Sequence, residues 1–392
     1  MTEKKVLILT SDTGGGHTSA ARALEAGLGL CAGGATYLVH IAKAMEENGL
    51  LTERLGAVYN YLLRHRQHYV HYYHSAINRF RPDKWGLVYR FGTKYGRQLV
   101  GKFGPNVIVS VHPMMQAFFS RLLAELNLAD QIPLVTVVTD PCGNSWKGWA
   151  DDGVRLYLVA HEDARRELLS LGVAPERIRI CGMPIHPKFD AVAKTPDVRA
   201  QVLSEFGLDP NRFTVLVNAG WAGGGNIPEL FRQITGADLP VQAIFVAGRN
   251  DALRVEAEYR AQTAPFPVRV VGYTEQMERL MTSANVMVSK LGGLTTFEAL
   301  ACKLPIIGDA VTRPMPQEER TATMLEDAGA GVMVHRTADV VPLIRRLASN
   351  SSEYLALRSS AGSLGIPDAT QRIVSEIDSL FLPLGRAAAP GA

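Results

Sequence analysis

A histidine follows three consecutive glycines near the start of the chain, in the segment Ser11-Asp12-Thr13-Gly14-Gly15-Gly16-His17. An imidazole has an ordinary pKa of about 6.5, so His17 could act as a general base at neutral pH. Glycines let the backbone approach a ligand closely, and a helix that begins here would direct its unpaired N–H groups at an anion. The segment predicts a catalytic or anion-binding turn, and the alternative is a histidine that only orients a tight turn.

This turn matches neither of two common nucleotide-binding fingerprints. No lysine follows the glycines, as G-x-x-x-x-G-K-[ST] requires, and His17, Thr18 and Ser19 occupy the later positions of G-x-G-x-x-G. The turn alone therefore does not identify its ligand.

A second glycine turn, Lys290-Leu-Gly-Gly-Leu-Thr-Thr296, lies between an apolar run and a helix-like stretch. Gly292 and Gly293 leave room for a phosphate, while Thr295 and Thr296 offer hydroxyls and N–H groups at the expected helix start. Glu298, expected in the first turn of that helix, could accept two hydrogen bonds from a ribose diol. Its alternative role is that of an acid favoured by the helix dipole. The combination favours a ribonucleotide.

Other polar residues follow expected strands. Asp140 competes with His17 as the base, acting directly or by orienting an imidazole, and its alternative role is turn capping. His112 could contact either substrate or be a hydrogen-bonded histidine beside a proline turn. Arg249 could neutralise phosphate charge, and Gly220 lies in a glycine loop that could face a diphosphate.

The elements that must position these residues are predicted by short apolar runs that alternate with helix-like segments. Uniformly apolar strands separated by helices are typical of parallel sheets buried on both faces. Because the pattern occurs twice, we expect an α/β fold with two doubly wound Rossmann-like domains that face a cleft. The expected strands are 6–10, 36–40, 107–111, 134–138, 155–159, 178–181, 213–218, 242–247, 268–271, 286–289, 305–307 and 332–334.

The break between the two patterns, at 186–196, is predicted to be the linker. We expect a first domain over 1–190 and a second domain over 197–365. A helix over 366–384 is expected to cross back to the first domain, and 385–392 is expected to be disordered. Ligands bind beyond the carboxyl ends of such strands, so the cleft is the expected site.

Composition excludes several classes of protein. A chain of 392 residues is too long for one ordinary core. The four cysteines form no C-x-x-C pair, which argues against a zinc or disulfide framework and fits a reducing cytoplasm. No run approaches the roughly 20 apolar residues of a membrane span. We therefore expect a soluble protein or one that lies on a membrane surface.

Residues 64–102 combine nine Lys or Arg and eight aromatic residues with one acid, Asp83. Such a segment fits a surface that lies on anionic lipid, with Arg79, Arg81, Lys84 and Trp85 as the expected contacts. The alternatives are a helix with a solvated basic face and a single-stranded nucleic-acid site, which nothing else in the sequence favours. His65, His68, His71 and His74 recur every three residues, which spreads them around a helix and argues against a metal site.

Several motifs together resemble a known family. The string G-G-x-T-x-x-E-A-x-x-x-x-x-P, at Gly292–Pro305, resembles the nucleotide-sugar site of two-domain GT-B glycosyltransferases. The first glycine turn, Pro105–Gln116, Gly272–Glu278 and Gln317-Glu318 resemble monogalactosyldiacylglycerol synthases, whose pattern processive diacylglycerol glucosyltransferases largely share. The resemblance runs from about residue 4 to 336, in order and with similar spacing.

The resemblance implies an inverting transfer of galactose or glucose from a UDP-sugar to diacylglycerol, without a cofactor or required metal. It implies a peripheral enzyme on the cytoplasmic face of the membrane, with UDP-hexose, diacylglycerol and an anionic surface as partners and no nucleic acid. His17 or Asp140 would be the base, and the acceptor would contact His112, Trp146 and Trp149. The implied donor-binding residues are Gly15, Gly16, Gly220, Arg249, Tyr273, Lys290, Gly292, Gly293, Thr295, Thr296, Glu298, Gln317 and Glu318.

The chain departs from the family pattern after Thr139-Asp140, where Asn144 and Ser145 occupy the stretch in which a histidine is common. Three alternatives stay open: a UDP-N-acetylglucosamine 2-epimerase, an N-acetylglucosamine transferase with a lipid-linked acceptor, and an inactive sugar-nucleotide-binding module. The sequence leaves the donor sugar and the oligomeric state undetermined.

Overall fold

The structure is a computed structural model that describes residues 3–13, 15–30, 36–47, 54, 56–58, 61, 69–143, 146–220, 224–312, 314 and 316–381. Some residues considered in the sequence lie outside this part: Gly14, Cys31, His65, His68, Asn144, Ser145, the side chain of Gln317 and the tail 385–392.

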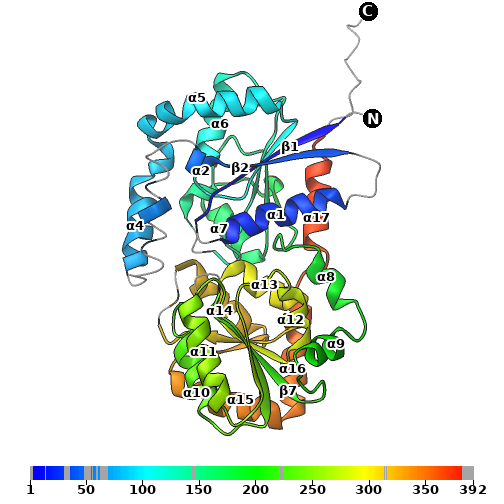
Figure 1. Ribbon diagram of the computed structural model, residues 1–392. Helices are drawn as coiled ribbons and strands as arrows, with labels where there is room; N and C mark the ends of the chain where they lie inside the picture. The colour runs from blue at the N-terminus through cyan, green and yellow to red at the C-terminus, as the bar shows by residue number, and fades with distance from the viewer. Residues whose placement is uncertain are drawn as a thin grey trace, which may run out of the picture.

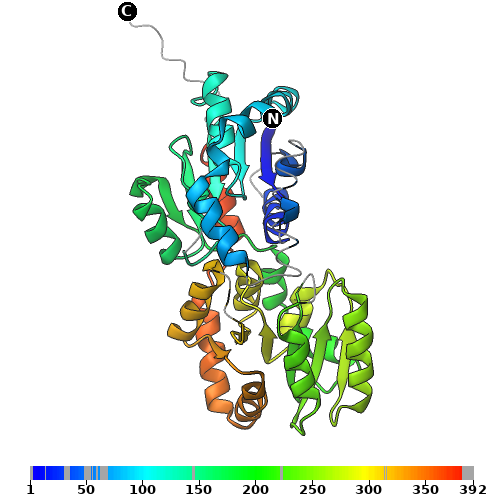
Figure 2. The ribbon, with the colours of Figure 1, turned by 90° about the vertical axis from the view of Figure 1, so that its left-hand side faces the viewer.

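The described chain forms two α/β lobes, one above the other in Figure 1, each built on a six-stranded parallel sheet. Figure 2 shows the same two lobes after a quarter turn about the vertical axis. The strand order is β2-β1-β3-β4-β5-β6 in the first sheet and β12-β11-β10-β7-β8-β9 in the second. The first sheet contains β1 (Lys4–Thr10), β2 (Tyr37–Lys43), β3 (Val107–Ser110), β4 (Leu134–Val137), β5 (Leu156–Val159) and β6 (Ile178–Ile180). The second contains β7 (Phe213–Asn218), β8 (Val241–Val246), β9 (Val268–Val271), β10 (Val286–Ser289), β11 (Ile306–Asp309) and β12 (Gly331–Val334).

The predicted fold class is therefore confirmed, and every expected strand is present with its ends shifted by at most three residues. The central strands are apolar on both faces because helices cover both sides. In β3, β4, β5 and β10 every residue is buried.

Helices connect the strands as in other doubly wound sheets. The first lobe contains α1 (Gly16–Gly29), α2 (Ala44–Glu47), α4 (Val70–Phe80), α5 (Gly86–Phe103), α6 (Gln116–Glu125) and α7 (Glu162–Ser170). The second lobe and its connection contain α8 (Lys188–Ala193), α9 (Val198–Glu205), α10 (Ile227–Thr235), α11 (Asp251–Thr263), α12 (Met277–Ser283), α13 (Gly293–Ala301), α14 (Pro316–Asp327), α15 (Val340–Ser349) and α16 (Ser351–Leu364). None of the helices in the described part of the chain is long and apolar enough to cross a membrane.

The segment between the two sheets contains helix α8, whose Phe189 is buried in a core cluster with residues of the second lobe. This connection is thus a packed element that lies where the two lobes meet, which places its polar residues beside the cleft.

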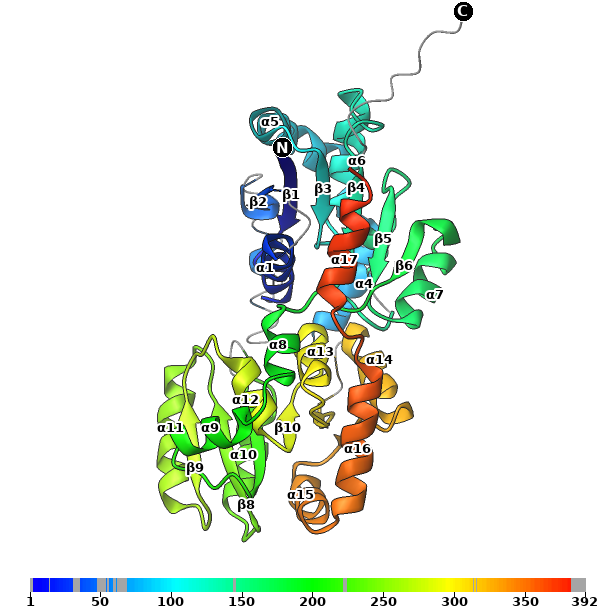
Figure 3. The same ribbon diagram turned by 90° about the vertical axis from the view of Figure 1, so that its right-hand side faces the viewer.

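The last helix, α17 (Ala369–Asp378), lies beside α1 and against the first sheet (Figure 3). Its Ile373, Val374 and Ile377 are fully buried in the cluster that holds Leu24 and Leu28 of α1. The two helices approach closely at Gly27, where an added Cβ would lie 2.6 Å from Thr370 Cγ2. The chain therefore crosses from the second lobe back to the first, and this contact ties the lobes together a second time.

Candidate active site

His17 is the second residue of α1, directly beyond the carboxyl end of β1 in the middle of the first sheet. Gly15 precedes the helix in a left-handed conformation, with φ of 79°, which favours glycine and allows the sharp turn. The turn therefore brings an imidazole to the edge of the sheet at which doubly wound folds bind ligands.

Two groups hold one nitrogen of the His17 ring. Nδ1 lies 2.7 Å from the carbonyl oxygen of Val111 and 3.0 Å from the Thr139 hydroxyl. A carbonyl oxygen can only accept a hydrogen bond, so Nδ1 carries the ring proton. In the neutral ring this leaves Nε2 as a nitrogen with a free lone pair, the form that a general base needs.

The surroundings of His17 keep its ring neutral. Burial lowers the pKa of His17 below its ordinary value of 6.5. The negative charge of Asp140 and the hydrogen bond to Val111 oppose this shift without reversing it. The imidazole is thus unprotonated at neutral pH, yet a carboxylate is close enough to stabilise the imidazolium formed by proton uptake.

His112 lies against His17, with ring centroids 4.5 Å apart in an edge-on arrangement, but its two nitrogens are both engaged. The Met114 amide donates to Nδ1 at 3.3 Å, so Nε2 carries the proton and donates to the Thr13 hydroxyl at 2.9 Å. Burial and the neighbouring His17 hold the pKa of His112 well below 6.5. His112 therefore has no free lone pair and is an uncharged neighbour of the candidate base.

Asp140 follows β4 and is held by an indole. Trp149 Nε1 donates to Asp140 Oδ2 at 2.7 Å, and the Trp149 side chain is fully buried. Trp149 lines neither cavity because its ring lies in the core, and its predicted contact with the acceptor stays a prediction. Its role is to fix the carboxylate.

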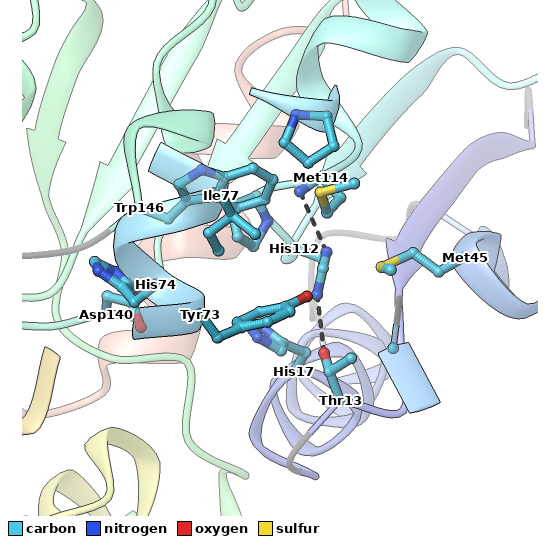
Figure 4. A pocket seen from close by; sticks show the side chains of 13 residues that line it. Thr13, His17, Met45, Tyr73, His74, Ile77, His112, Met114, Asp140 and Trp146 are labelled. Atoms are coloured by element: carbon cyan, nitrogen blue, oxygen red, sulfur yellow. Dashed lines mark hydrogen bonds between the residues drawn. The ribbon is translucent and has the colours of Figure 1, made fainter. Parts of the chain in front are cut away.

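His17, His112 and Asp140 line one cavity in the first lobe, and Figure 4 shows them gathered beneath the helix that carries Tyr73 and His74. Most of the remaining wall is apolar. Trp146, predicted as an acceptor contact, is part of this wall. The apolar lining residues are Met45, Ile77, Pro82, Pro113, Met114 and Trp146.

A second cavity, of about 580 Å³, lies in the cleft between the lobes. This volume is in the range of small-molecule sites. Four predicted donor residues line it: Gly220, Tyr273, Thr295 and Glu298. The sequence interpretation missed Ser19 and Arg22 of α1 and His186 and Lys188 at α8. The helical spacing of Ser19, Arg22 and Ala26 could have revealed one face of α1 directed at the cleft.

Glu298 lies in the second turn of α13, not in the first turn as predicted, because the helix begins at Gly293. Its carboxyl group lines the cleft cavity. Burial raises the pKa of Glu298 to about 7, with Glu278 adding to the shift and the Lys188 ammonium opposing it. A polar partner that donates hydrogen bonds would favour the ionised form.

The neighbouring threonines differ in position. Thr295 lines the cleft, whereas Thr296 is 1% exposed and its hydroxyl has no hydrogen-bond partner among the described residues. The Thr296 hydroxyl thus lies inside the protein and outside the wall of the cleft cavity, and its predicted contact with a ligand stays a prediction. One residue along a helix turns a side chain by about 100°, which directs Thr296 into the core.

Lys290 lies under the glycine loop that follows β7. A Cβ at Gly225 would lie 2.6 Å from Lys290 Cε, and Asp309 accepts a hydrogen bond from the Asn226 amide at 3.1 Å. Burial lowers the pKa of Lys290, while Glu318 and Asp309 oppose the shift. Lys290 is thus placed to support the loop from below, and it is not part of the wall of the cleft cavity.

The remaining predicted donor residues lie around this cavity. Arg249 is exposed and its guanidinium carbon lies 4.3 Å from the centre of the Tyr273 ring. Glu318 approaches Gly292, where an added Cβ would be 3.9 Å from its Oε1. Gly15 and Gly16 shape the start of α1 and line neither cavity.

The basic aromatic segment covers α4, α5 and the short turn between them. Arg79, Lys84 and Trp85 are exposed, but Arg81 is half-buried and forms an ion pair with the buried Asp83, with Nη2 2.6 Å from Oδ2. We therefore exclude Arg81 from the expected membrane contacts, because its charge is neutralised within the protein. Large apolar side chains are also exposed here: Tyr69, Tyr72, Phe80, Trp85, Leu87 and Phe91.

One group of metal-type side chains occurs among the described residues: Cys142, His161 and Asp163, whose ligand atoms lie within 4.8 Å of one another. The group lines neither cavity. Asp163 is already 3.2 Å from Arg166, and its amide donates to His161 Nδ1. The spacing of the cysteines in the sequence could not predict this group, because it contains only one cysteine together with a histidine and an aspartate.

Comparisons with known proteins agree with this geometry. Residues 17–185 match the family model of monogalactosyldiacylglycerol (MGDG) synthase, and residues 225–373 match that of the glycosyltransferase family 28 C-terminal domain. A processive diacylglycerol beta-glucosyltransferase of Bacillus pumilus is 28% identical over 96% of this chain and 95% of its own. A probable monogalactosyldiacylglycerol synthase 2, chloroplastic, of Oryza sativa subsp. japonica is 30% identical over 96% of this chain and 81% of its own.

Solved structures show the same fold at low identity. The MurG structure of Acinetobacter baumannii has a TM-score of 0.63 at 13% identity and covers 96% of this chain and 99% of its own. The structure of a UDP-GlcNAc 2-epimerase from Neisseria meningitidis, bound to UDP-GlcNAc, has a TM-score of 0.62 at 15% identity. The match covers 96% of this chain and 100% of the epimerase chain. The two-lobed architecture is thus that of the GT-B fold. With its near full-length relatives, the chain belongs to the glycosyltransferase family that comprises MGDG synthases and processive diacylglycerol glucosyltransferases.

Proposed function

We propose that this protein transfers galactose or glucose from a UDP-sugar to the hydroxyl of diacylglycerol, with inversion at the anomeric carbon. One observation carries the proposal: a neutral histidine with a free Nε2 lines an apolar cavity beside a separate cleft of nucleotide size. An apolar cavity suits a lipid acceptor, whereas an epimerase needs no acceptor site.

In this reaction His17 Nε2 takes the proton of the acceptor hydroxyl. The hydroxyl oxygen forms a bond to the anomeric carbon from the face opposite UDP, and the bond from that carbon to the diphosphate oxygen breaks. The imidazolium that forms is stabilised by the Asp140 charge and by the bond from Nδ1 to Val111. The departing diphosphate gains negative charge, which the unpaired N–H groups at the start of α13 are suited to stabilise.

The reaction is tested with liposomes that contain diacylglycerol and with labelled UDP-galactose, UDP-glucose or UDP-N-acetylglucosamine. We expect a glycolipid from UDP-galactose or UDP-glucose, detected by thin-layer chromatography and mass spectrometry. Product from UDP-N-acetylglucosamine alone would reassign the donor. An absence of product with all three donors would contradict the proposal and favour an inactive sugar-nucleotide-binding module.

Replacement of His17 by alanine is expected to lower kcat by roughly 10²- to 10⁴-fold, the usual contribution of a general base. UDP affinity should stay within about twofold, because His17 does not line the donor cleft. In the unchanged protein, kcat should fall only as pH drops below about 6.5, since burial lowers the pKa of His17. Steady-state kinetics across pH and calorimetric UDP titration provide the measurements. Full activity in the variant would transfer the role of base to Asp140.

Replacement of Glu298 by glutamine is expected to weaken UDP binding by roughly tenfold or more, because a carboxylate accepts stronger hydrogen bonds from the ribose hydroxyls than an amide does. 2′-Deoxy-UDP provides a matched ligand. It should bind the unchanged protein more weakly than UDP, and the E298Q variant should scarcely distinguish the two. Equal discrimination by both proteins, measured by calorimetry, would show that Glu298 does not contact the ribose.

We further propose that the exposed cations and aromatic rings of α4 and α5 lie on the membrane. The cavity that holds His17 is walled by Tyr73, His74 and Ile77 of α4, so this contact would place the cavity beside the lipid. Cations near an anionic surface and aromatic rings at the headgroup level both favour such binding.

Replacing Arg79 and Lys84 together by glutamine is expected to weaken binding to phosphatidylglycerol vesicles on the order of tenfold, since each cation is attracted to the anionic surface. The effect should shrink at high salt. A double replacement of Lys303 and Arg345, which are exposed in the second lobe and form no ion pair among the described residues, removes the same charge and serves as the control in a sedimentation assay. An equal loss of vesicle binding in the two variants would show that only the net charge matters, and it would contradict a membrane-binding surface on α4 and α5.

A further inference from the structure

The two lobes meet closely where the segment after β4 contacts the start of α13. An added Cβ at Gly293 would lie 3.0 Å from Pro141 Cδ and 3.1 Å from the Thr139 carbonyl oxygen, whereas ordinary contacts begin near 3.4 Å. At the preceding Gly292 the nearest such atom is 3.9 Å away. A side chain at 293 would therefore require Thr139 and Pro141 of the first lobe to shift by a few tenths of an ångström.

The backbone of Gly293 does not require glycine. Its φ is not in the left-handed region, and it is the first residue of α13. Alanine has a higher helix propensity than glycine, so a substitution would not weaken the helix itself. The close approach of Thr139 and Pro141 is what disfavours a side chain at this position.

The same segment holds the catalytic histidine. The Thr139 hydroxyl lies 3.0 Å from His17 Nδ1, and the charge of Asp140 acts on the same ring. A displacement of Thr139 would therefore change both the orientation of His17 and its distance from the carboxylate.

The far end of the segment is anchored in the second lobe. Cys142 Sγ lies 3.3 Å from Met324 Sδ of α14, and both side chains are buried in the cluster that contains Leu291 and Phe297. Pro141 adds a rigid ring between this anchor and Asp140. Because the segment is anchored at Cys142, a side chain at position 293 would displace Thr139 and Asp140 by steric contact.

We propose that Gly293 is a positioning residue that couples the donor helix α13 to His17 through the Thr139–Cys142 segment. Because Thr295 and Glu298 of the same helix line the donor cleft, the contact fixes the base relative to the donor. This inference rests on the proposed transfer reaction. It separates the two glycines: an added Cβ at Gly292 would meet only Glu318, at 3.9 Å, whereas one at Gly293 would meet the opposite lobe.

The test compares Gly293→Ala with the unchanged protein in the liposome assay. We expect kcat to fall roughly ten- to hundredfold, because displacements below 1 Å at a reacting group have effects of this size. UDP affinity should change by less than about threefold. A loss of UDP affinity with kcat preserved would instead place Gly293 in the donor site and overturn the proposal.

The double variant Gly293→Ala/Pro141→Ala provides the rescue. It removes Pro141 Cδ, the atom 3.0 Å from the added methyl group, and should recover part of the lost kcat. The effect of the pair should therefore be smaller than the product of the two single effects. Additive losses would contradict the contact. Thermal denaturation of all variants identifies any that fail to fold.

A second readout does not depend on turnover. With histidine labelled by ¹⁵N, the ring resonances of His17, assigned with the His17→Ala variant, should shift in Gly293→Ala and return toward their original positions in the double variant. Unchanged resonances in Gly293→Ala would refute the coupling. If the unchanged protein makes no glycolipid, the proposed function fails, and the resonance test still decides this inference.

Discussion

The hydrogen bond between His17 Nδ1 and the carbonyl of Val111 is the interaction on which the candidate site depends. It exists because β1 and β3 are neighbours in the first sheet and the ladder continues beyond β3, where the Val111 amide donates to Leu9 at 3.0 Å. This register holds the Val111 carbonyl beside the turn that ends β1. The backbone of one strand thereby decides which nitrogen of a side chain on another element carries its proton.

His17 and His112 lie against each other, yet they carry their ring protons on different nitrogens because different groups form hydrogen bonds to their rings. His17 has a carbonyl and a carboxylate nearby, so its protonated form is stabilised when a proton arrives. His112 accepts a bond from an amide and donates to a hydroxyl, and the neighbouring ring further disfavours its charge. A pair of adjacent imidazoles can thus contain a single base. The sequence, in which each histidine follows an expected strand, could not distinguish them.

The central strands were predictable because a parallel strand buried on both faces must be mostly apolar. The edge strands β2, β6 and β9 also carry the exposed His40, Arg179 and Arg269, so their pattern was weaker. What the sequence could not predict is the direction of individual side chains. Thr296 and Trp149 both carry hydrogen-bonding groups and lie at the expected positions in the chain. The helical rotation between Thr295 and Thr296 buries Thr296, and the Trp149 indole donates a hydrogen bond to Asp140 within the core. Arg81 belonged to a basic run, yet an acid two residues later neutralises it. Lys188 was missed since only the packing of the lobes brings α8 to the donor cleft, whereas the helical spacing of Ser19, Arg22 and Ala26 was a signal for α1.

The charges around the donor cleft constrain how a diphosphate could be stabilised there. Lys188 is 2.9 Å from Glu278, and Lys290 lies among the carboxylates of Asp309 and Glu318, so both ammonium groups already face negative partners. Groups available for an anion include the N–H groups at the start of α13, the exposed guanidinium of Arg249 beside Tyr273 and, on the opposite lobe, the exposed guanidinium of Arg22. Helix N–H groups act only over a short range, within the first turn. Stabilisation of the leaving group would then depend on where α13 stands relative to α1. In our proposal the contact of Gly293 with Thr139 and Pro141 sets the distance between α13 and the first lobe. The missing side chain at Gly293 would then affect the position of the base His17 and the position of the N–H groups that face the leaving group.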